Sequence, residues 1–120
     1  MRTRIFDDSG NVVGYIEDTE IKDALFETLG YVEGEEIKDK FYNTLAYVKD
    51  NQVMNSRYGP LAIIDENMVK NTEYKTICYF FKDTIKDGFF NVIGHFEDGL
   101  NQSQIISVIL LIFKIIKIKK

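Results

Sequence analysis

A short segment that returns every 16 residues constrains the fold of this chain more than any other feature. It reads Val12-Val13-Gly14-Tyr15-Ile16 at its first occurrence, and five further copies follow at the same spacing without an insertion. The aligned units cover residues 4–19, 20–35, 36–51, 52–67, 68–83 and 84–99. A fixed period of this kind indicates a repeat architecture, in which each unit buries its apolar surface against its neighbours.

Each unit has the pattern of a β-hairpin. Its second position is always β-branched and apolar, and two residues later stands an Asp or an Asn, whose side chain can cap a tight turn by accepting backbone N–H groups. The predicted turn caps are Asp7, Asp23, Asp39, Asn55, Asn71 and Asp87. A longer strand follows, and polar pairs such as Asp18-Thr19 lead into the next unit. About twelve short strands are therefore expected, which is typical of all-β repeat folds.

The turn itself changes composition after the first unit. Gly10 can adopt the positive φ that a type I turn followed by a bulge requires. The later units carry aromatic residues at this position: Phe26, Tyr42, Tyr58, Tyr74 and Phe90. Because a left-handed backbone is unfavourable for bulky side chains, we expect either a different turn or a shifted register in these units.

Two segments, residues 19–30 and 36–48, also fit an amphipathic helix. The corresponding part of the first unit contains Ser9-Gly10-Asn11, and that of the fourth contains Gly59-Pro60. These residues do not suit a helix interior. Since copies of one unit share one fold, the hairpin interpretation is favoured.

The centre of every long strand holds a small residue. The six positions are Gly14, Gly30, Ala46, Ala62, Cys78 and Gly94. Repeated exclusion of bulk predicts a crowded place, at the axis of a closed ring or against a closely packed sheet. Closure would also remove exposed sheet edges. We therefore predict an all-β fold of six hairpins in a closed or radial arrangement, with an open β-solenoid as the alternative.

The 16-residue period, the Ile-x-Asp opening and the Gly-Tyr-Ile strand resemble the bacterial β-flower repeat proteins over residues 4–99. This resemblance implies hairpins set like petals about a pseudo-symmetry axis, and it implies no established activity. The motif is weaker at Ile63, Cys78 and His95, which departs from strict regularity of the ring.

Charge divides the chain in two. The net charge is −4, but residues 1–99 hold all 19 acidic side chains and 11 basic ones, and residues 100–120 hold four lysines and no acid. An acidic body excludes nucleic acid as an expected partner, because phosphate binding requires a basic surface. The single cysteine, Cys78, cannot form an internal disulfide and suits a reducing compartment. We expect a cytoplasmic location, since no apolar leader precedes Ile5.

Residues 100–120 form an apolar and basic tail outside the repeat. Its apolar run from Ile105 to Phe113 is shorter than the roughly 17–25 residues that span a bilayer. Three interpretations remain: a helix packed on the repeat or on a partner, a degenerate seventh strand, and a helix lying on a membrane surface with its lysines at one end. We expect residues 1–99 to fold without the tail, and the tail to mediate self-association or docking on a partner protein.

Few residues point to chemistry. His95 occupies the position held by Tyr15, Tyr31, Tyr47 and Tyr79, and no second ligand accompanies it, so neither a metal site nor a catalytic group is predicted. Cys78 fills the small position and is expected to be buried and inert. The turn caps could gather at one end of a closed ring and bind calcium, although turn capping explains them.

The repeated tyrosines could stack against a sugar, although cross-strand packing explains them as well. We therefore predict a non-enzymatic structural or interaction module without a cofactor. A small glycan- or ligand-binding module that uses Tyr15, Tyr31, Tyr47 and Tyr79 is the alternative, and weak membrane association through the tail is a third.

Overall fold

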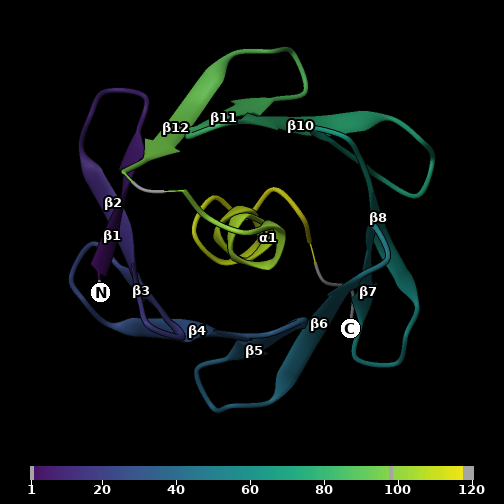
Figure 1. Cartoon of the computed structure of the whole chain (residues 1–120), viewed down its shortest axis with the longest axis horizontal. Helices are drawn as coiled ribbons and strands as arrows, with labels where there is room; N and C mark the ends of the chain where they lie inside the picture. The colour runs from purple at the N-terminus through teal and green to yellow at the C-terminus, as the bar shows by residue number, and fades with distance from the viewer. Residues whose placement is uncertain (1, 98, 118–120) are drawn as a thin grey trace.

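The computed structural model describes residues 2–97 and 99–117. Within them, twelve β-strands pair antiparallel in the order of the sequence and close into a ring around one helix (Figure 1). The strands are β1 (Arg2–Asp7), β2 (Val12–Glu17), β3 (Glu20–Asp23), β4 (Thr28–Glu33), β5 (Glu36–Asp39), β6 (Thr44–Lys49), β7 (Gln52–Asn55), β8 (Pro60–Asp65), β9 (Met68–Lys70), β10 (Thr76–Phe81), β11 (Thr84–Asp87) and β12 (Val92–Phe96). The predicted closed ring of hairpins is confirmed, and the open solenoid and the helical interpretation of residues 19–30 and 36–48 are wrong.

Pairing between the first and last strands closes the ring. Ile5 of β1 lies opposite Phe96 of β12, and Phe6 lies opposite His95. At the same seam, the Arg4 guanidinium of β1 donates to the carboxylate of Glu97, which follows β12, over 2.6 Å. Closure leaves no unpaired strand edge in the described part of the chain, which is the usual benefit of a closed sheet.

Every hairpin has the same turn, built on its Asp or Asn. In the first hairpin, Oδ1 of Asp7 accepts the backbone N–H groups of Ser9 and Asn11, each over 2.9 Å. The same two bonds recur at the other five caps: Asp23, Asp39, Asn55, Asn71 and Asp87. One side-chain oxygen therefore satisfies two backbone donors that the tight turn leaves without a strand partner.

The expectation that the turn changes after the first unit is wrong. The five aromatic residues take the left-handed conformation of Gly10, with φ between 65° and 70°: Phe26, Tyr42, Tyr58, Tyr74 and Phe90. Their rings gain contacts that a glycine lacks. Phe26, for example, packs edge-on against Tyr15 with 5.2 Å between ring centroids, and the Lys22 ammonium lies 3.8 Å from its ring. Aromatic and cation–π contacts of this kind are each worth roughly 0.5–1.5 kcal/mol, which offsets the backbone cost of about 1–3 kcal/mol.

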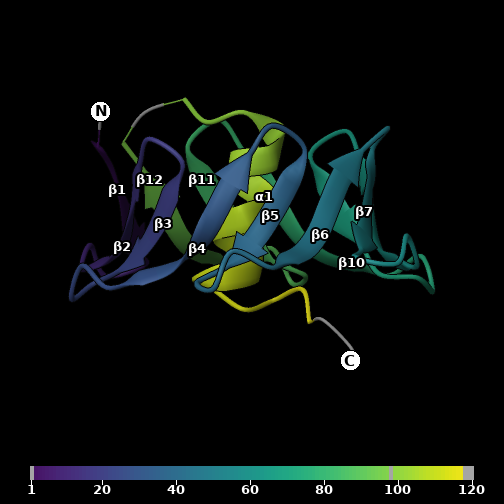
Figure 2. The ribbon, with the colours of Figure 1, turned by 90° about the horizontal axis from the view of Figure 1, so that it is seen from below.

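The tail forms helix α1 (Gln102–Leu111), which runs through the centre of the ring along its axis (Figures 1 and 2). Asn101 begins it with a capping box, in which the Asn101 side chain accepts from the Gln104 N–H and the Gln104 side chain accepts from the Asn101 N–H. Residues 105–110 are buried and belong to one hydrophobic core with the inward-facing side chains of the strands. The tail is therefore a helix rather than a seventh strand, and it packs on the repeat of its own chain.

Three of the small residues of the long strands lie against the last residue of this helix or the two residues after it. A Cβ added to Gly14 would lie 2.6 Å from Ile112 Cδ1, and one added to Gly94 would lie 2.4 Å from Phe113 Cζ. At Gly30 the added atom would lie 2.2 Å from the Lys38 carbonyl oxygen. The crowding predicted from the repeat thus comes from the chain's own tail and from the neighbouring strand.

The two ends of the ring differ. We call the end that carries the six hairpin turns the tip face, and the end that carries the links between hairpins the link face. Figure 2 shows that α1 starts at the link face and that the chain leaves the ring at the tip face. No helix among the described residues has the length and apolarity needed to cross a bilayer.

Candidate functional site

The repeated tyrosines pack against the aromatic residues of neighbouring turns. Each lies on the strand before a hairpin and meets the ring of that next turn, as Tyr31 meets Tyr42 with 5.1 Å between ring centroids. Tyr47 and Tyr58 stack at 4.8 Å and line, together with Glu33, Glu35, Glu36 and Lys49, a cavity of about 250 Å³. The pairs Tyr15–Phe26 and Tyr79–Phe90 complete the set. The aromatic surface that a sugar would need is thus partly occupied by contacts within the chain.

His95 lies at the seam of the ring. Its facing turn is that of the first hairpin, where Gly10 offers no ring, and His95 instead stacks on Phe6 with 4.9 Å between centroids and 18° between planes. Phe6 itself stands where most other hairpins have a lysine, such as Lys22. The histidine therefore takes the stacking role of the repeated tyrosine against a different partner.

The turn caps do not form one cluster. Each is engaged by its own turn, and within residues 2–97 and 99–117 no group of three or more His, Cys, Asp or Glu side chains is placed to hold a metal ion. The hydrogen bonds of each turn account for these side chains, as the sequence predicts. Backbone N–H groups hold the pKa of two of these carboxyls below its ordinary value, chiefly that of Asn11 for Asp7 and that of Asn91 for Asp87.

Cys78 is fully buried in the core, and burial raises the pKa of its thiol to about 12. A thiol in this state is protonated at neutral pH, and the thiolate is the form that attacks or ligates. The residue thus fills the small position of its strand with a buried, protonated thiol.

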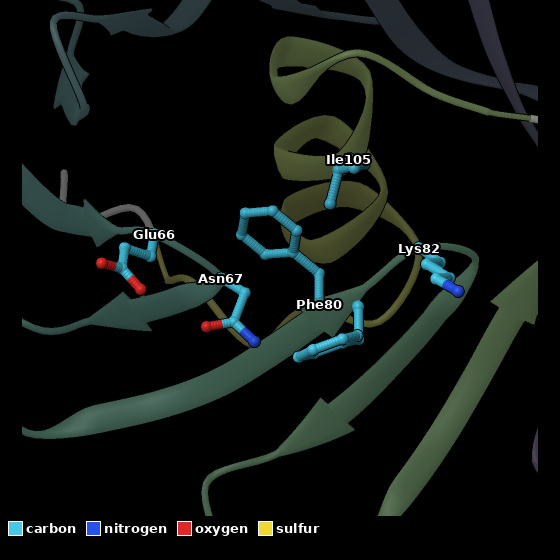
Figure 3. A pocket seen from close by; sticks show the side chains of 6 residues that line it. Glu66, Asn67, Phe80, Lys82 and Ile105 are labelled. Atoms are coloured by element: carbon cyan, nitrogen blue, oxygen red, sulfur yellow. The ribbon is translucent and has the colours of Figure 1, made fainter.

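A cleft at the link face is the feature that the sequence reasoning missed. It has a volume of about 570 Å³ and is lined by Glu66, Asn67, Phe80, Phe81, Lys82 and Ile105. Figure 3 shows Glu66 and Lys82 at opposite ends, with Phe80 between them and Ile105 reaching in from α1. The helix makes its closest contacts with β3–β6, which leaves this space between α1 and the region around β10.

One residue in the sequence signals this cleft. Phe81 ends its long strand at a position that is charged in the other five units: Glu17, Glu33, Lys49, Asp65 and Glu97. Its side chain is 53% exposed. A single apolar residue at a position that is charged in the other five units indicates a local function that the fold of the repeat does not require.

Besides the aromatic residues of the turns described above, the tip face carries large apolar side chains in solvent at one further equivalent position. Leu25, Phe41 and Phe89 are 81%, 74% and 88% exposed, and each stands two residues after its turn cap. The chain that leaves the ring at this face adds the exposed Lys114 and Lys117. A cavity of about 350 Å³ lies there, lined by Leu110, Leu111, Lys114, Ile116 and Lys117.

Comparison with protein families gives one match. Residues 2–62 and, in an overlapping match, residues 20–114 fit the family described as 5-fold beta-flower protein. The two matches together extend over residues 2–114, and the chain belongs to this family, as its repeat motif predicted. The ring has six hairpins here. No curated protein and no solved structure matches the chain.

Proposed function

We propose that this β-flower protein is a non-enzymatic interaction module that associates with a protein partner, a second copy of itself, through the tip face. The observation that supports this proposal is the exposure of Leu25, Phe41 and Phe89 at one equivalent position. Exposed apolar groups favour association because burial of their surface removes it from water. The end of the tail, residues 112–117, belongs to the same face and takes part in the contact.

The fold does not require apolar residues at this position. The turn uses only the backbone N–H of the residue two after the cap, as at Ser9, Arg57 and Glu73 of the remaining hairpins. Three of six hairpins nevertheless carry a large apolar side chain there. A property that folding leaves free and that three equivalent sites share is best accounted for by a partner.

The test is a variant in which Leu25, Phe41 and Phe89 are all changed to Ser, the residue of the first hairpin. We expect wild-type protein to associate with rising concentration in sedimentation velocity. The variant should stay monomeric over the same range, with an unchanged circular dichroism spectrum and thermal midpoint. Equal association of the two proteins, or a wild type that is monomeric throughout, would refute the proposal. Flotation of the wild type with anionic vesicles would point to the membrane alternative.

The location is part of the same proposal. A chain with one buried thiol, Cys78, has no disulfide to form, and this suits the reducing cytoplasm.

The cleft at the link face supports a second candidate function, binding of a small ligand. Its volume of about 570 Å³ lies in the range of small-molecule sites, roughly 300–1,000 Å³. Phe80, Phe81 and Ile105 supply apolar contact, and Lys82 supplies a positive charge. Glu66 and Lys82 lie at opposite ends of the cleft, so the Lys82 end is the part that suits the anionic group of an otherwise apolar ligand.

The fluorescent anion 1-anilinonaphthalene-8-sulfonate is a suitable probe for this cleft. We expect its emission to rise with wild-type protein and with the triple serine variant, which keeps the cleft intact. Phe81→Glu, which restores the charged residue of other units, should abolish the increase. An increase that survives Phe81→Glu would place the probe elsewhere and count against a ligand site here.

A further inference from the structure

The six residues that stand two positions after the turn caps carry side chains of different kinds. Their order around the ring fits one particular dimer. In the order of the hairpins they are Ser9, Leu25, Phe41, Arg57, Glu73 and Phe89, and all six are exposed. They stand at the tips of six hairpins spaced around the ring (Figure 1). A dimer of this kind rests on the proposed function, because the tip face is the surface that associates.

Two identical rings that meet face to face are related by a two-fold axis perpendicular to the ring axis. Such an interface is isologous, so that when hairpin a meets hairpin b, b also meets a. The hairpins of the second copy then run in the opposite sense around the ring. Six relative rotations of the two rings bring tips opposite tips, and each rotation fixes all contacts at once.

One of these six rotations sets no charged tip against an apolar tip or against a like charge. It brings Arg57 of one copy opposite Glu73 of the other, and it is the single rotation that pairs these two charges. The same rotation brings Phe41 opposite Phe89 and Leu25 opposite Ser9. Each of the other five sets a charged tip against an apolar one, or a charge against its like, which disfavours association.

We propose that the chain forms a two-fold dimer through the tip face in this rotation, with the contacts Phe41–Phe89, Arg57–Glu73 and Leu25–Ser9, each made twice. Arg57 and Glu73 form no ion pair within the described residues of their own chain, so both are open to a partner. Charge pairs with this geometry set orientation and exclude the other rotations.

The size of the face fits a stable dimer. The ring measures 33 by 32 Å across, and a disc of these dimensions has an area of about 830 Å². This cross-section is of the same order as the roughly 800 Å² of accessible surface that each partner buries in a protein–protein interface of standard size, so the face is wide enough to hold one. Residues 112–117 of both copies lie inside the circle of tips, where their lysines carry the charge opposite to that of the acidic turn caps.

Charge reversal tests the rotation in solution. Arg57→Glu sets two acidic side chains against each other at both symmetry-related contacts, and Glu73→Arg does the same with two basic ones. We expect each single variant to raise the dissociation constant at least tenfold in sedimentation equilibrium, and the double variant Arg57→Glu/Glu73→Arg to return close to the wild-type value. A double variant as weak as the single ones would overturn the rotation.

Cross-linking tests the apolar contact independently. A mixture of Phe41→Cys and Phe89→Cys, oxidised with glutathione disulfide, should give a covalent dimer of one chain of each, while neither variant alone should cross-link. The native Cys78 is buried and does not interfere. Cross-linking of either variant alone would show that like tips meet and would refute the rotation.

The choice of interface and the choice of rotation can fail separately. If wild-type protein dimerises, the triple serine variant does not, and the charge reversals fail to compensate, the tip face is the interface but the rotation is wrong. If the triple serine variant dimerises as the wild type does, the proposed function and the rotation are both wrong. Recovery of dimerisation in the double charge variant, together with cross-linking only in the mixture of cysteine variants, would establish the dimer in this rotation.

Discussion

Removal of the tail is the perturbation with the largest expected effect on this fold. Six apolar side chains of the tail are between 0% and 6% exposed: Ile105, Ile106, Val108, Ile109, Leu110 and Ile116. Burial of one such side chain stabilises a fold by about 1.5–3 kcal/mol, so the six together contribute on the order of 9–18 kcal/mol. A whole domain is typically stable by only about 5–15 kcal/mol.

We therefore predict that residues 1–99 do not close into the native ring on their own. This reverses the expectation drawn from the repeat alone, in which residues 1–99 fold without the tail. Removal of the tail also exposes the inward-facing residues of the strands, so apolar burial is lost on both surfaces of the contact. The residues that face the axis, such as Ile21 and Ile37, are fully buried in the intact protein.

Urea unfolding followed by circular dichroism measures this effect on residues 1–99 and on the full chain. We expect a cooperative transition for the full chain and none for residues 1–99. A synthetic peptide of residues 100–117, added in excess, should restore the transition, with a midpoint that rises with the logarithm of the peptide concentration. In the full chain, Ile109→Asp should abolish folding, while Lys117→Asp at an exposed position should leave it unchanged. A cooperative transition of residues 1–99 at the midpoint of the full chain would refute the reasoning.

Three further predictions concern single positions. Gly30→Ile should lower the free energy of unfolding by at least about 1–3 kcal/mol through overpacking, whereas Gln52→Ile on the exposed side of a strand should change it by less than about 0.5 kcal/mol in the same denaturant titration. Because burial raises the pKa of the Cys78 thiol to about 12, a disulfide reagent at pH 8 should modify it only as fast as the protein unfolds, and complete labelling of folded protein within minutes would contradict this. Asp7 and Asp87 have lowered pKa values in the folded protein, so their ionised forms stabilise the fold at pH values above their unfolded pKa of about 4. This stability is lost as the pH falls through the lower pKa values of the folded state. Replacing both with Asn, the cap of two other units, should therefore flatten the acid limb of a plot of thermal midpoint against pH.

The ring could be predicted from the sequence because its requirements repeat six times. A β-branched residue that recurs without exception, as at Ile5 and Ile85, shows which side of each strand is buried. The small residue identified the axis as crowded, although the sequence left open what crowds it. Six equivalent observations of each position made the pattern stronger than any single hairpin could.

The tail could not be assigned in the same way, because it occurs once. Its isoleucines suit a strand by propensity, and its apolar run suits a buried helix equally well. The closed ring decides between them. Among the described residues, all its strand edges are paired within the ring, so a seventh strand has no edge to join, and its apolar interior holds the helix. That information lies in the tertiary structure, since the repeat motif does not show how wide the closed ring will be.

The error about the turns has a local cause. The sequence shows the backbone cost of a positive φ at Tyr42, but it does not show which residues the Tyr42 ring contacts. In the structure the Tyr42 hydroxyl donates to the Glu33 carboxylate, its ring meets Tyr31, and the Lys38 ammonium lies 3.7 Å from the ring centroid. Tyr31 and Glu33 lie on β4 of the preceding hairpin, and only Lys38 lies on the hairpin of Tyr42 itself. Two of the three contacts therefore form only when the hairpins pair.

Within such a repeat, a residue that departs from its position should be explained by its immediate neighbours, and the seam allows a direct test. Phe6, Gly10 and His95 all depart from the pattern: Phe6 and His95 stack where the first and last hairpins join, and Gly10 stands in the turn that carries an aromatic ring in the other hairpins. If they depart as a set, Phe6→Lys alone should lose the stacked pair and cost roughly 0.5–1.5 kcal/mol. The triple variant Phe6→Lys/Gly10→Phe/His95→Tyr should recover this loss by building the lysine–aromatic–tyrosine contact of the second hairpin. Chemical denaturation of the single, triple and wild-type proteins measures both steps, and a triple variant less stable than Phe6→Lys would show that the seam differs from the other junctions for a reason outside these three residues.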